Sequence, residues 1–411
     1  VLMNILESYA QVIAETTHSI IGFDTLITDD HGIIIGSNHP DRTGKMHAHS
    51  IVVIRRGMAE SIDDQKAGEL GVRPGVCLPI RLGNEIVGTV GIAGSPDEVR
   101  KYGHLVQKEA ELFLREKALQ ETSHLRESAV SNLMNQAISF DPKDMNETVL
   151  LSQGKGLGYD LAVPRIVLLV DIIQFGKVVD SVRSEEEYAH DAELRIQTIK
   201  SSILKLLRNI FNESQDIVSN TGSDKYLILM TIPGPANAAA TKQRVLGKAT
   251  TAAATLREKG YSASIGIGFP AFAPDEFKRS FRSAWRAVNI GRKLGRDTSI
   301  YDIGDFELED LLLSLNREAA REYAGKNLSK LFDAPQWSPE LDETLREWLR
   351  SPSCPGEVAR RLGIHRNTLS YRLEKIGGLG SFDPKDPSDI FTLKISLLLR
   401  DLHIEQHPQR E

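Results

Sequence analysis

The stretch that decides the architecture runs from Pro355 to Ile376 and reads PGEVARRLGIHRNTLSYRLEKI. Its first part predicts a short amphipathic helix that ends at Gly363, because glycine adopts the left-handed conformation without steric cost. A second helix is predicted to start near His365. Apolar residues recur along it at helical spacing: Leu369, Leu373 and Ile376. Two short helices joined by a tight turn are typical of a helix-turn-helix, whose second helix lies in the DNA major groove.

The charge of this stretch also favours a nucleic-acid partner. It holds five basic and two acidic residues, whereas the whole chain has a net charge of −6 and a pI near 6.1. A basic island on an acidic protein suits contact with phosphates. The alternative interpretation is a helical hairpin whose basic side chains are only solvated, and the pattern favours DNA binding over it.

The same residues resemble a known family. RLGIHRNTLSYRLEKI is similar to the C-terminal helix-turn-helix shared by the carbohydrate diacid regulators and the purine catabolism regulators of bacteria, in which the phrase gi-H-x-N-T-L-x-Y-R-L-x-k-I opens the recognition helix. The resemblance implies operator DNA as a partner. The glycine-rich run 377–380 that follows predicts a loop before a closing amphipathic helix.

Side chains at the start of a recognition helix are the ones that reach base edges. We expect Asn367 to pair with adenine and Arg366 with guanine, and the remaining polar residues to contact the DNA backbone. Alternatively, Asn367 or Thr368 caps the helix and Tyr371 packs in the core. The full predicted DNA-contacting set is Arg360, Arg361, His365, Arg366, Asn367, Thr368, Ser370, Tyr371, Arg372 and Lys375.

Composition sets the wider limits. A chain of 411 residues is long enough for two or three domains of about 100–200 residues each. No apolar run approaches the ~20 residues that a membrane-spanning helix needs. Cys77 and Cys354 lie far apart and lack metal-ligand spacing, which indicates a reducing compartment. We therefore expect a cytoplasmic protein with no membrane association, metal or cofactor.

The N-terminal part alternates helices, strands and turn signals. The elements predicted there are a helix over 6–21, strands over 23–28 and 33–36, a polar loop over 37–47, a helix over 49–56, and a hairpin of 76–82 with 85–93. This order predicts a small antiparallel sheet with helices on one side. PAS- and GAF-like sensors are built in this way, and the fold alone leaves their ligand open.

Two runs in this part resemble the sugar diacid recognition domain of the carbohydrate diacid regulators. They are IIGSNHPDRTGKMH at 34–47 and GVCLPIRLGNEIVGTVGIAGSPDEVRKYGHLV at 75–106, and the likeness covers most of residues 4–130. It implies a response to sugar acids such as glucarate, galactarate and glycerate. Cys77 stands where relatives often carry Asn, which leaves the preferred acid open.

A sugar acid needs a guanidinium for bidentate contact with its carboxylate, together with neutral donors. Arg42 is the strongest candidate for the carboxylate contact, and His47 is a candidate donor. Any one of the polar loop residues could instead cap a turn or be solvated. The full predicted ligand-binding set is Ser37, Asn38, Arg42, Gly44, His47, Leu78, Pro79, Thr89 and Gly91.

A long helix is predicted from about 97 to 138, with no internal proline. Leu105, Leu112 and Leu119 follow a seven-residue period, which favours a seam with the same helix of a second copy. The alternative is a helix folded back on the sensor domain. The seam predicts a homodimer.

The middle part has the order of elements of a GGDEF nucleotide-cyclase fold, which it resembles. Its strand RIVLLVDII at 165–173 is apolar throughout, as expected in a sheet buried on both faces. The catalytic hairpin of that family is replaced by TGSDKY at 221–226, in which Lys225 brings a positive charge to the metal site. Asp171 alone would hold Mg²⁺ poorly. We therefore expect no enzyme here, but a scaffold for dimerisation or signal relay.

Together these patterns predict an α+β multidomain chain. The expected parts are a PAS/GAF-like sensor domain over 1–135 that includes the connecting helix, a degenerate GGDEF-like domain over 140–304, and an all-α helix-turn-helix domain over 305–411. The expected function is a sugar-acid-responsive transcription activator of genes for glucarate, galactarate or glycerate uptake and catabolism. The alternative is a regulator of the same architecture that senses a purine or another small molecule.

Overall fold

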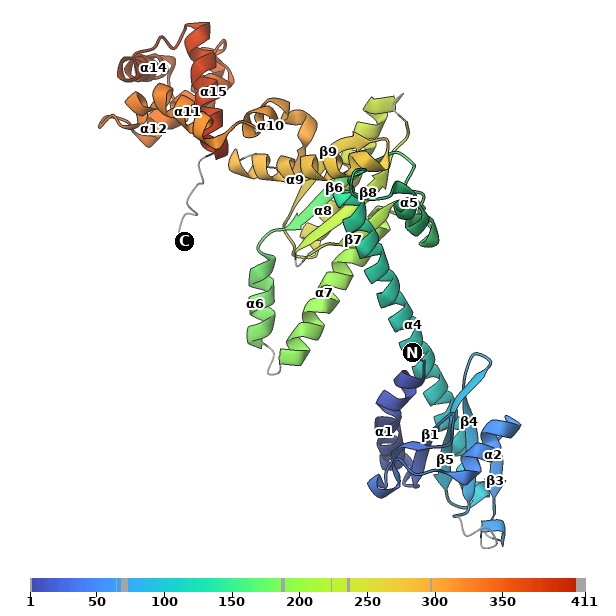
Figure 1. Ribbon diagram of the computed structural model, residues 1–411. Helices are drawn as coiled ribbons and strands as arrows, with labels where there is room; N and C mark the ends of the chain where they lie inside the picture. The colour runs from blue at the N-terminus through green and yellow to red at the C-terminus, as the bar shows by residue number, and fades with distance from the viewer. Residues whose placement is uncertain are drawn as a thin grey trace. The chain divides into compact units, whose positions relative to one another are not determined.

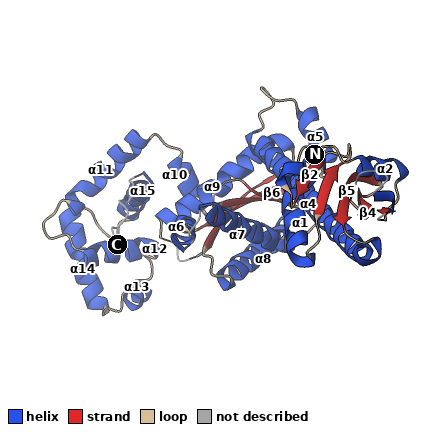
Figure 2. Cartoon of the chain, turned by 90° about the horizontal axis from the view of Figure 1, so that it is seen from below, coloured by secondary structure: helices blue, strands red, loops and turns tan. Residues whose placement is uncertain are grey.

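The chain forms two compact units, Val1–Ser128 and Ala129–Glu411 (Figure 1). The structure is a computed structural model that describes residues 2–63, 65–67, 73–185, 189–222, 224–234, 237–295 and 298–403. It mixes helices and strands, and its C-terminal part is wholly helical (Figure 2). Within the described residues, no helix combines the length and the apolar character needed to cross a membrane.

The first unit is built on a five-stranded antiparallel sheet of order β2-β1-β5-β4-β3. Its elements are α1 (Leu2–Ile21), β1 (Thr25–Asp29), β2 (Ile34–Ser37), the 3₁₀ helix η1 (Pro40–Arg42), α2 (Ala48–Arg56), β3 (Glu60–Ile62), β4 (Gly75–Leu82), β5 (Glu85–Ala93) and α4 (Pro96–Ser139). The predicted helices and both hairpins are confirmed. Sequence patterns had not predicted β3, because three residues are too few to show an alternation.

Helices cover both faces of this sheet, so the expectation of helices on one side was wrong. Leu78 and Val90 point into a core shared with α1 and α4. Their neighbours in the strands, Cys77 and Thr89, point to the opposite face, where both lie within hydrogen-bonding reach of Ser50 on α2. The second face therefore carries polar side chains.

The second unit begins with a second five-stranded sheet of order β10-β9-β6-β8-β7, antiparallel except for the β9–β10 pair. Its elements are α5 (Glu147–Gly156), β6 (Arg165–Ile172), α6 (Phe175–Glu185), α7 (Ala189–Ile210), β7 (Ile217–Asn220), β8 (Lys225–Thr231), α8 (Ala238–Glu258), β9 (Ala263–Ala271), η3 (Pro274–Glu276), α9 (Phe277–Lys293), β10 (Ile300–Asp302) and η4 (Ile303–Asp305). Every residue of β6 is buried, which confirms the prediction of a strand covered on both faces.

Two glycines of β9 allow α9 to lie directly against that strand. A side chain at Gly266 would come within 2.1 Å of the Ala284 carbonyl oxygen, and one at Gly268 within 2.0 Å of the Ser280 carbonyl oxygen. Ser280 also accepts a hydrogen bond from the Val167 amide through its Oγ, at 3.0 Å. The close contact of α9 with the sheet therefore depends on glycine at both positions.

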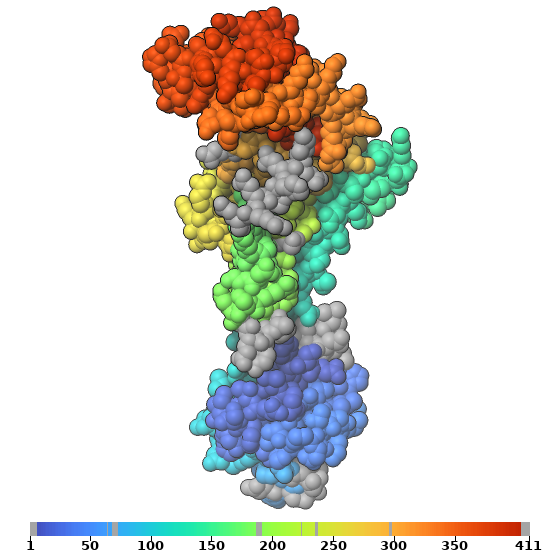
Figure 3. Space-filling view, turned by 90° about the vertical axis from the view of Figure 1, so that its left-hand side faces the viewer, coloured from blue at the N-terminus to red at the C-terminus, as the bar shows by residue number. Residues whose placement is uncertain are grey.

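The C-terminal helices continue from this domain without a separate core. They are α10 (Glu307–Leu313), α11 (Arg317–Phe332), α12 (Pro339–Arg350), α13 (Pro355–Arg361), α14 (Arg366–Gly380) and α15 (Pro387–His403). One apolar cluster extends from Val167 in β6 to Leu402 in α15. His403 Nε2 lies 3.0 Å from the carbonyl oxygen of Leu312, which joins α15 to α10. In Figure 3 the orange and red residues of these helices form one continuous surface.

The predicted loop at 377–380 is instead the last turn of α14. Its C-cap is Ser381, which adopts the left-handed conformation. A side chain at Gly377 would come within 2.8 Å of the Phe382 carbonyl oxygen, and one at Gly380 within 2.5 Å of the Phe382 ring. The glycines are there to let the following segment pack against the helix, and they do not interrupt it.

Candidate effector cavity and nucleic-acid interface

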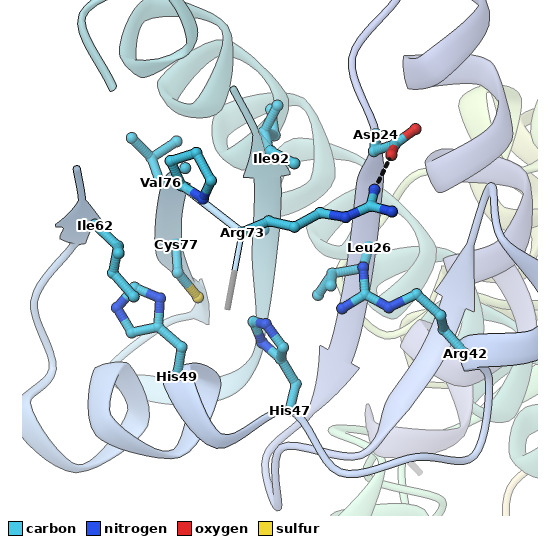
Figure 4. Close-up of a pocket in the computed structure, with 14 residues that line it drawn as sticks. Asp24, Leu26, Arg42, His47, His49, Ile62, Arg73, Val76, Cys77 and Ile92 are labelled. Carbon is cyan, nitrogen blue, oxygen red and sulfur yellow. Dashed lines mark hydrogen bonds and ion pairs between the residues drawn. The ribbon is translucent and has the colours of Figure 1, made fainter. Parts of the chain in front are cut away.

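A cavity of about 270 Å³ opens on the α2 face of the first unit (Figure 4). It lies between β1, the ends of β4 and β5, and the segment that leads into α2. Its lining residues are Asp24, Leu26, Arg42, His47, His49, Ile62, Arg73, Pro74, Gly75, Val76, Cys77, Gly91, Ile92 and Ala93. Three of the predicted ligand-binding residues line it: Arg42, His47 and Gly91.

Arg42 ends η1 and points into the cavity together with the His47 ring (Figure 4). In the described part of the chain, no hydrogen bond or ion pair to its guanidinium is found. Its positive charge is therefore available to a ligand. A half-buried guanidinium without a carboxylate partner is suited to bidentate binding of a carboxylate.

His47 is the N-cap residue of α2 and belongs to a chain of buried polar groups. Its Nδ1 lies 2.8 Å from Ser50 Oγ, Ser50 Oγ lies 2.6 Å from Thr89 Oγ1, and Thr89 Oγ1 lies 2.9 Å from Thr28 Oγ1. Because Nδ1 is engaged by Ser50, Nε2 is the nitrogen left to face a ligand. Sequence patterns had not singled out Ser50 or Thr28.

Burial, with the positive charge of Arg42 and the neighbouring His49, lowers the pKa of His47 to about 4. Burial also lowers the pKa of His49, although Glu60, 3.5 Å away, opposes this. Both imidazoles are therefore neutral at pH 7. A neutral imidazole can donate one hydrogen bond to a ligand and brings no charge of its own.

The cavity holds one ion pair that sequence analysis missed. Arg73 Nη1 lies 2.5 Å from Asp24 Oδ2, and Asp24 is held further by Asn38 Nδ2 at 2.9 Å and by His39 Nε2 at 2.8 Å. Burial raises the pKa of Asp24, but the contacts with His39 and Asn38 outweigh it and bring the pKa below its usual value. Asp24 is therefore ionised at neutral pH.

Other predicted ligand-binding residues lie outside the cavity and hold its framework. Ser37 is buried and its Oγ accepts from the His39 amide at 3.1 Å. Asn38 accepts from the Thr25 amide at 2.8 Å and orients Asp24. Gly44 is a turn residue with φ +81°. These placements favour structural roles for all three.

The predicted residues of the second hairpin divide between the two faces of the sheet. Leu78 points into the opposite core and cannot wall the cavity. Thr89 contacts Ser50 and does not line the cavity. Pro79, which is paired with Thr89 in the β4–β5 ladder, does not line it either. Cys77 does line the cavity, fully buried, and burial raises the pKa of its thiol.

The helix-turn-helix has the predicted geometry. Gly363 has φ +64° between α13 and α14. The N-cap of α14 is His365, whose Nδ1 accepts from the Asn367 amide at 3.3 Å, so neither Asn367 nor Thr368 caps the helix. Tyr371 is 65% exposed and does not pack in the core. The polar residues exposed on α14 are Arg366, Asn367, Thr368, Ser370, Tyr371, Glu374 and Lys375, and all but Glu374 belong to the predicted DNA-contacting set.

The predicted phosphate contacts are not equivalent. Arg361 Nε lies 2.8 Å from Glu347 and its Nη1 lies 3.1 Å from Glu357, so it links α13 to α12. Arg372 is half-buried and donates to Thr344 Oγ1 at 3.2 Å. Arg360 is exposed and has no such partner within the described ranges. Among these three, Arg360 is the one with its charge available to DNA.

Asp171, the candidate metal ligand of the middle domain, is already paired with cations. Asp171 Oδ2 lies 2.7 Å from Arg292 Nη1, and Asp171 Oδ1 lies 3.6 Å from Lys225 Nζ. Burial lowers the pKa of Lys225, but the hydrogen bond to Asp224 and the charge of Asp171 outweigh it, and the pKa lies above its usual value. Asp171 is therefore already paired with two cations, one of which is the lysine that sequence analysis had singled out.

Comparison with known proteins shows the family of the chain. A family model for sugar diacid recognition matches residues 5–137. The carbohydrate diacid regulator of Escherichia coli (strain K12) is 30% identical over 401 residues, which cover 95% of this chain and 96% of that protein. The chain belongs to the carbohydrate diacid regulator family.

Two further family models match later parts of the chain. A GGDEF-like model matches residues 143–290, and a PucR-type C-terminal helix-turn-helix model matches residues 341–399. The purine catabolism regulatory protein of Bacillus subtilis (strain 168) is 31% identical over 124 residues, 30% of this chain and 23% of that protein. A solved regulator of polyketide synthase expression from Bifidobacterium adolescentis is 15% identical and covers 66% of this chain and 91% of its own, with a TM-score of 0.28.

Proposed function

We propose that this protein is a cytoplasmic transcription activator that binds a sugar acid in the cavity of its first unit and operator DNA through α14. The sugar acid is of the glucarate, galactarate or glycerate class, and the genes controlled are those for its uptake and breakdown. Arg42 carries the proposal, because its guanidinium lines the cavity, has no ion-pair partner among the residues that the structure describes, and lies in the part that matches the sugar diacid model. The five-stranded antiparallel sheet around it supports a PAS/GAF-like sensor.

In the helix-turn-helix, the exposed start of α14 supports base recognition by Arg366 and Asn367. Thr368, Ser370 and Tyr371 then contact phosphates or sugars, and Arg360 and Lys375 contact phosphates. His365 keeps Nε2 free to donate to a phosphate while Nδ1 caps the helix.

We propose further that the protein is a homodimer joined along α4. Leu105, Leu112 and Leu119 are 62%, 66% and 65% exposed and recur every seven residues. Such a row is self-complementary, so a second copy of the same helix can bury it. Leu112→Glu should convert the dimer to a monomer in analytical ultracentrifugation, and a dimer that persists would contradict this assignment.

Effector binding then shifts the dimer between two states of different operator affinity, which requires that the acid bind the two states with different affinities. The middle domain serves as a scaffold in this scheme and performs no catalysis, in line with the pairing of Asp171 with two cations.

The test uses the full chain and DNA upstream of neighbouring sugar-acid genes. Titration calorimetry with glucarate, galactarate, glycerate and hypoxanthine identifies the effector class, and fluorescence anisotropy measures DNA affinity with and without the effector. We expect binding of at least one sugar acid and a changed affinity for DNA. Binding of hypoxanthine alone would sink the sugar-acid assignment and leave a DNA-binding regulator of another input.

A further inference from the structure

Among the described charged residues that line the cavity, one cation has no acidic partner. Arg42 and Arg73 are its cations and Asp24 is its carboxylate, while His47 and His49 are neutral at pH 7. Glu60, which faces His49, is itself paired with Arg56 at 2.5 Å. The described lining residues therefore carry a single net positive charge.

The two arginines differ in what they can offer a ligand. Arg42 has no acidic partner in the part of the chain that the structure describes, whereas Arg73 is already engaged by Asp24. Asp24 cannot turn away easily, because Asn38 and His39 hold its carboxylate at 2.9 and 2.8 Å. Figure 4 shows the Arg73 side chain extending to Asp24, above the Arg42 guanidinium in this view.

A second carboxylate on a ligand would meet an unfavourable environment here. It would have to displace Asp24 from Arg73 or lie beside Asp24, and like charges brought together in a partly enclosed site repel. A hydroxyl group can instead donate a hydrogen bond to a carboxylate oxygen of Asp24.

We propose that the cavity selects sugar acids with one carboxylate over those with two, and that Asp24 sets this selectivity by occupying Arg73. The carboxylate of the ligand binds Arg42, and its hydroxyl groups face Asp24. This inference rests on the proposed function, because it assumes that the cavity takes a sugar acid.

Two matched pairs of acids test it by titration calorimetry on the full chain. Gluconate and glucarate differ only in whether the sixth carbon is a hydroxymethyl or a carboxylate, and glycerate and tartronate differ in the same way at the third carbon. We expect the monoacid of at least one pair to bind about tenfold or more tighter, since like-charge contacts cost several kcal/mol.

Asp24→Asn should reduce the ratio of monoacid affinity to diacid affinity at least several-fold or reverse it, because Arg73 becomes available to a second carboxylate. Asp30→Asn removes the same charge from a turn that does not line the cavity and should keep the wild-type ratio. Arg73→Gln leaves Asp24 without its cation and should widen the ratio, which keeps the test open if Asp24→Asn fails to fold.

The outcomes separate this inference from the proposed function. A wild-type protein that binds the diacids more tightly, or a ratio that Asp24→Asn leaves unchanged, overturns the selectivity while the sugar-acid function stands. A wild-type protein that binds neither these four acids nor galactarate overturns both.

Discussion

The cavity of the first unit and the surroundings of Asp171 in the middle domain both contain carboxylates and cations, but they differ in whether charge is left over. In the cavity, Asp24 pairs with Arg73, and Arg42 has no partner among the described residues. In the middle domain, Asp171 of β6 is paired with Lys225 of β8 and with Arg292 of α9. The first arrangement can still bind an anion, and the second has no free carboxylate for a metal ion. Residue types alone would make both look like sites, and the pairing distinguishes them.

Removing the unpaired cation should have the largest effect. Arg42→Ala should weaken sugar-acid binding by about 10- to 100-fold, since a charge-assisted hydrogen bond contributes about 1.5–3 kcal/mol. Arg55→Ala removes a positive charge from an exposed position of α2 and should change affinity by less than about twofold. Calorimetry on both variants decides the matter, and equal losses would mean that general charge, and not contact, drives binding.

The same contrast recurs in the helix-turn-helix, where two adjacent arginines differ in whether an acidic residue pairs with them. Arg360→Ala should weaken DNA binding by about 1 kcal/mol and lower the slope of log affinity against log salt by about 0.9, because one phosphate contact is lost. Arg361→Ala should instead lower the free energy of unfolding, because it breaks the link to Glu347 and Glu357. Anisotropy over a range of salt concentrations and urea unfolding measure the two effects, and a reduced salt slope for Arg361→Ala would contradict the assignment.

Much of the fold could be predicted because it follows from local patterns. Gly363 and the apolar spacing of α14 define the helix-turn-helix, and the proline-free run of α4 defines the long helix. The short strands β3 and β10 and the helix α6 were missed, because three residues show no periodicity and α6 follows β6 without a strong cap signal. The run 377–380 was wrongly predicted to be a loop, because glycine is favoured both in loops and where a segment packs closely against a helix.

The candidate cavity could be predicted only in part. Arg42 and His47 were found because polar side chains crowd one loop of the sequence. Asp24, Ser50 and Arg73 were missed because each comes from a different segment, and only the folded sheet brings them together. Leu78 was misplaced because a one-residue step along β4 moves a side chain to the other face. The ion pairs could not be predicted either, because their partners come from segments that only the fold brings together.

Protonation offers a subtler test of the cavity. His47 has a pKa of about 4 in the free protein, and a bound carboxylate beside it raises that pKa. The protein should therefore take up roughly half a proton on binding at pH 5 and almost none at pH 7, and affinity should rise a few-fold as pH falls over that range. Calorimetry in buffers of different ionisation enthalpy measures the uptake. His47→Gln should abolish it, and an uptake that persists would assign the proton to His49 or another group.

Changes around Asp171 in the middle domain should have the smallest effect on stability. Millimolar Mg²⁺ with GTP should leave the unfolding curve of the wild-type protein unchanged, because a metal ion would have to displace both Lys225 and Arg292 from Asp171. Asp171→Asn leaves the two cations facing each other and should lower the free energy of unfolding by less than about 1 kcal/mol, since both cations are partly exposed and screened by solvent. Stabilisation by Mg²⁺ in the wild type that Asp171→Asn removes would show that this carboxylate is free after all, and the contrast with the cavity would then fail.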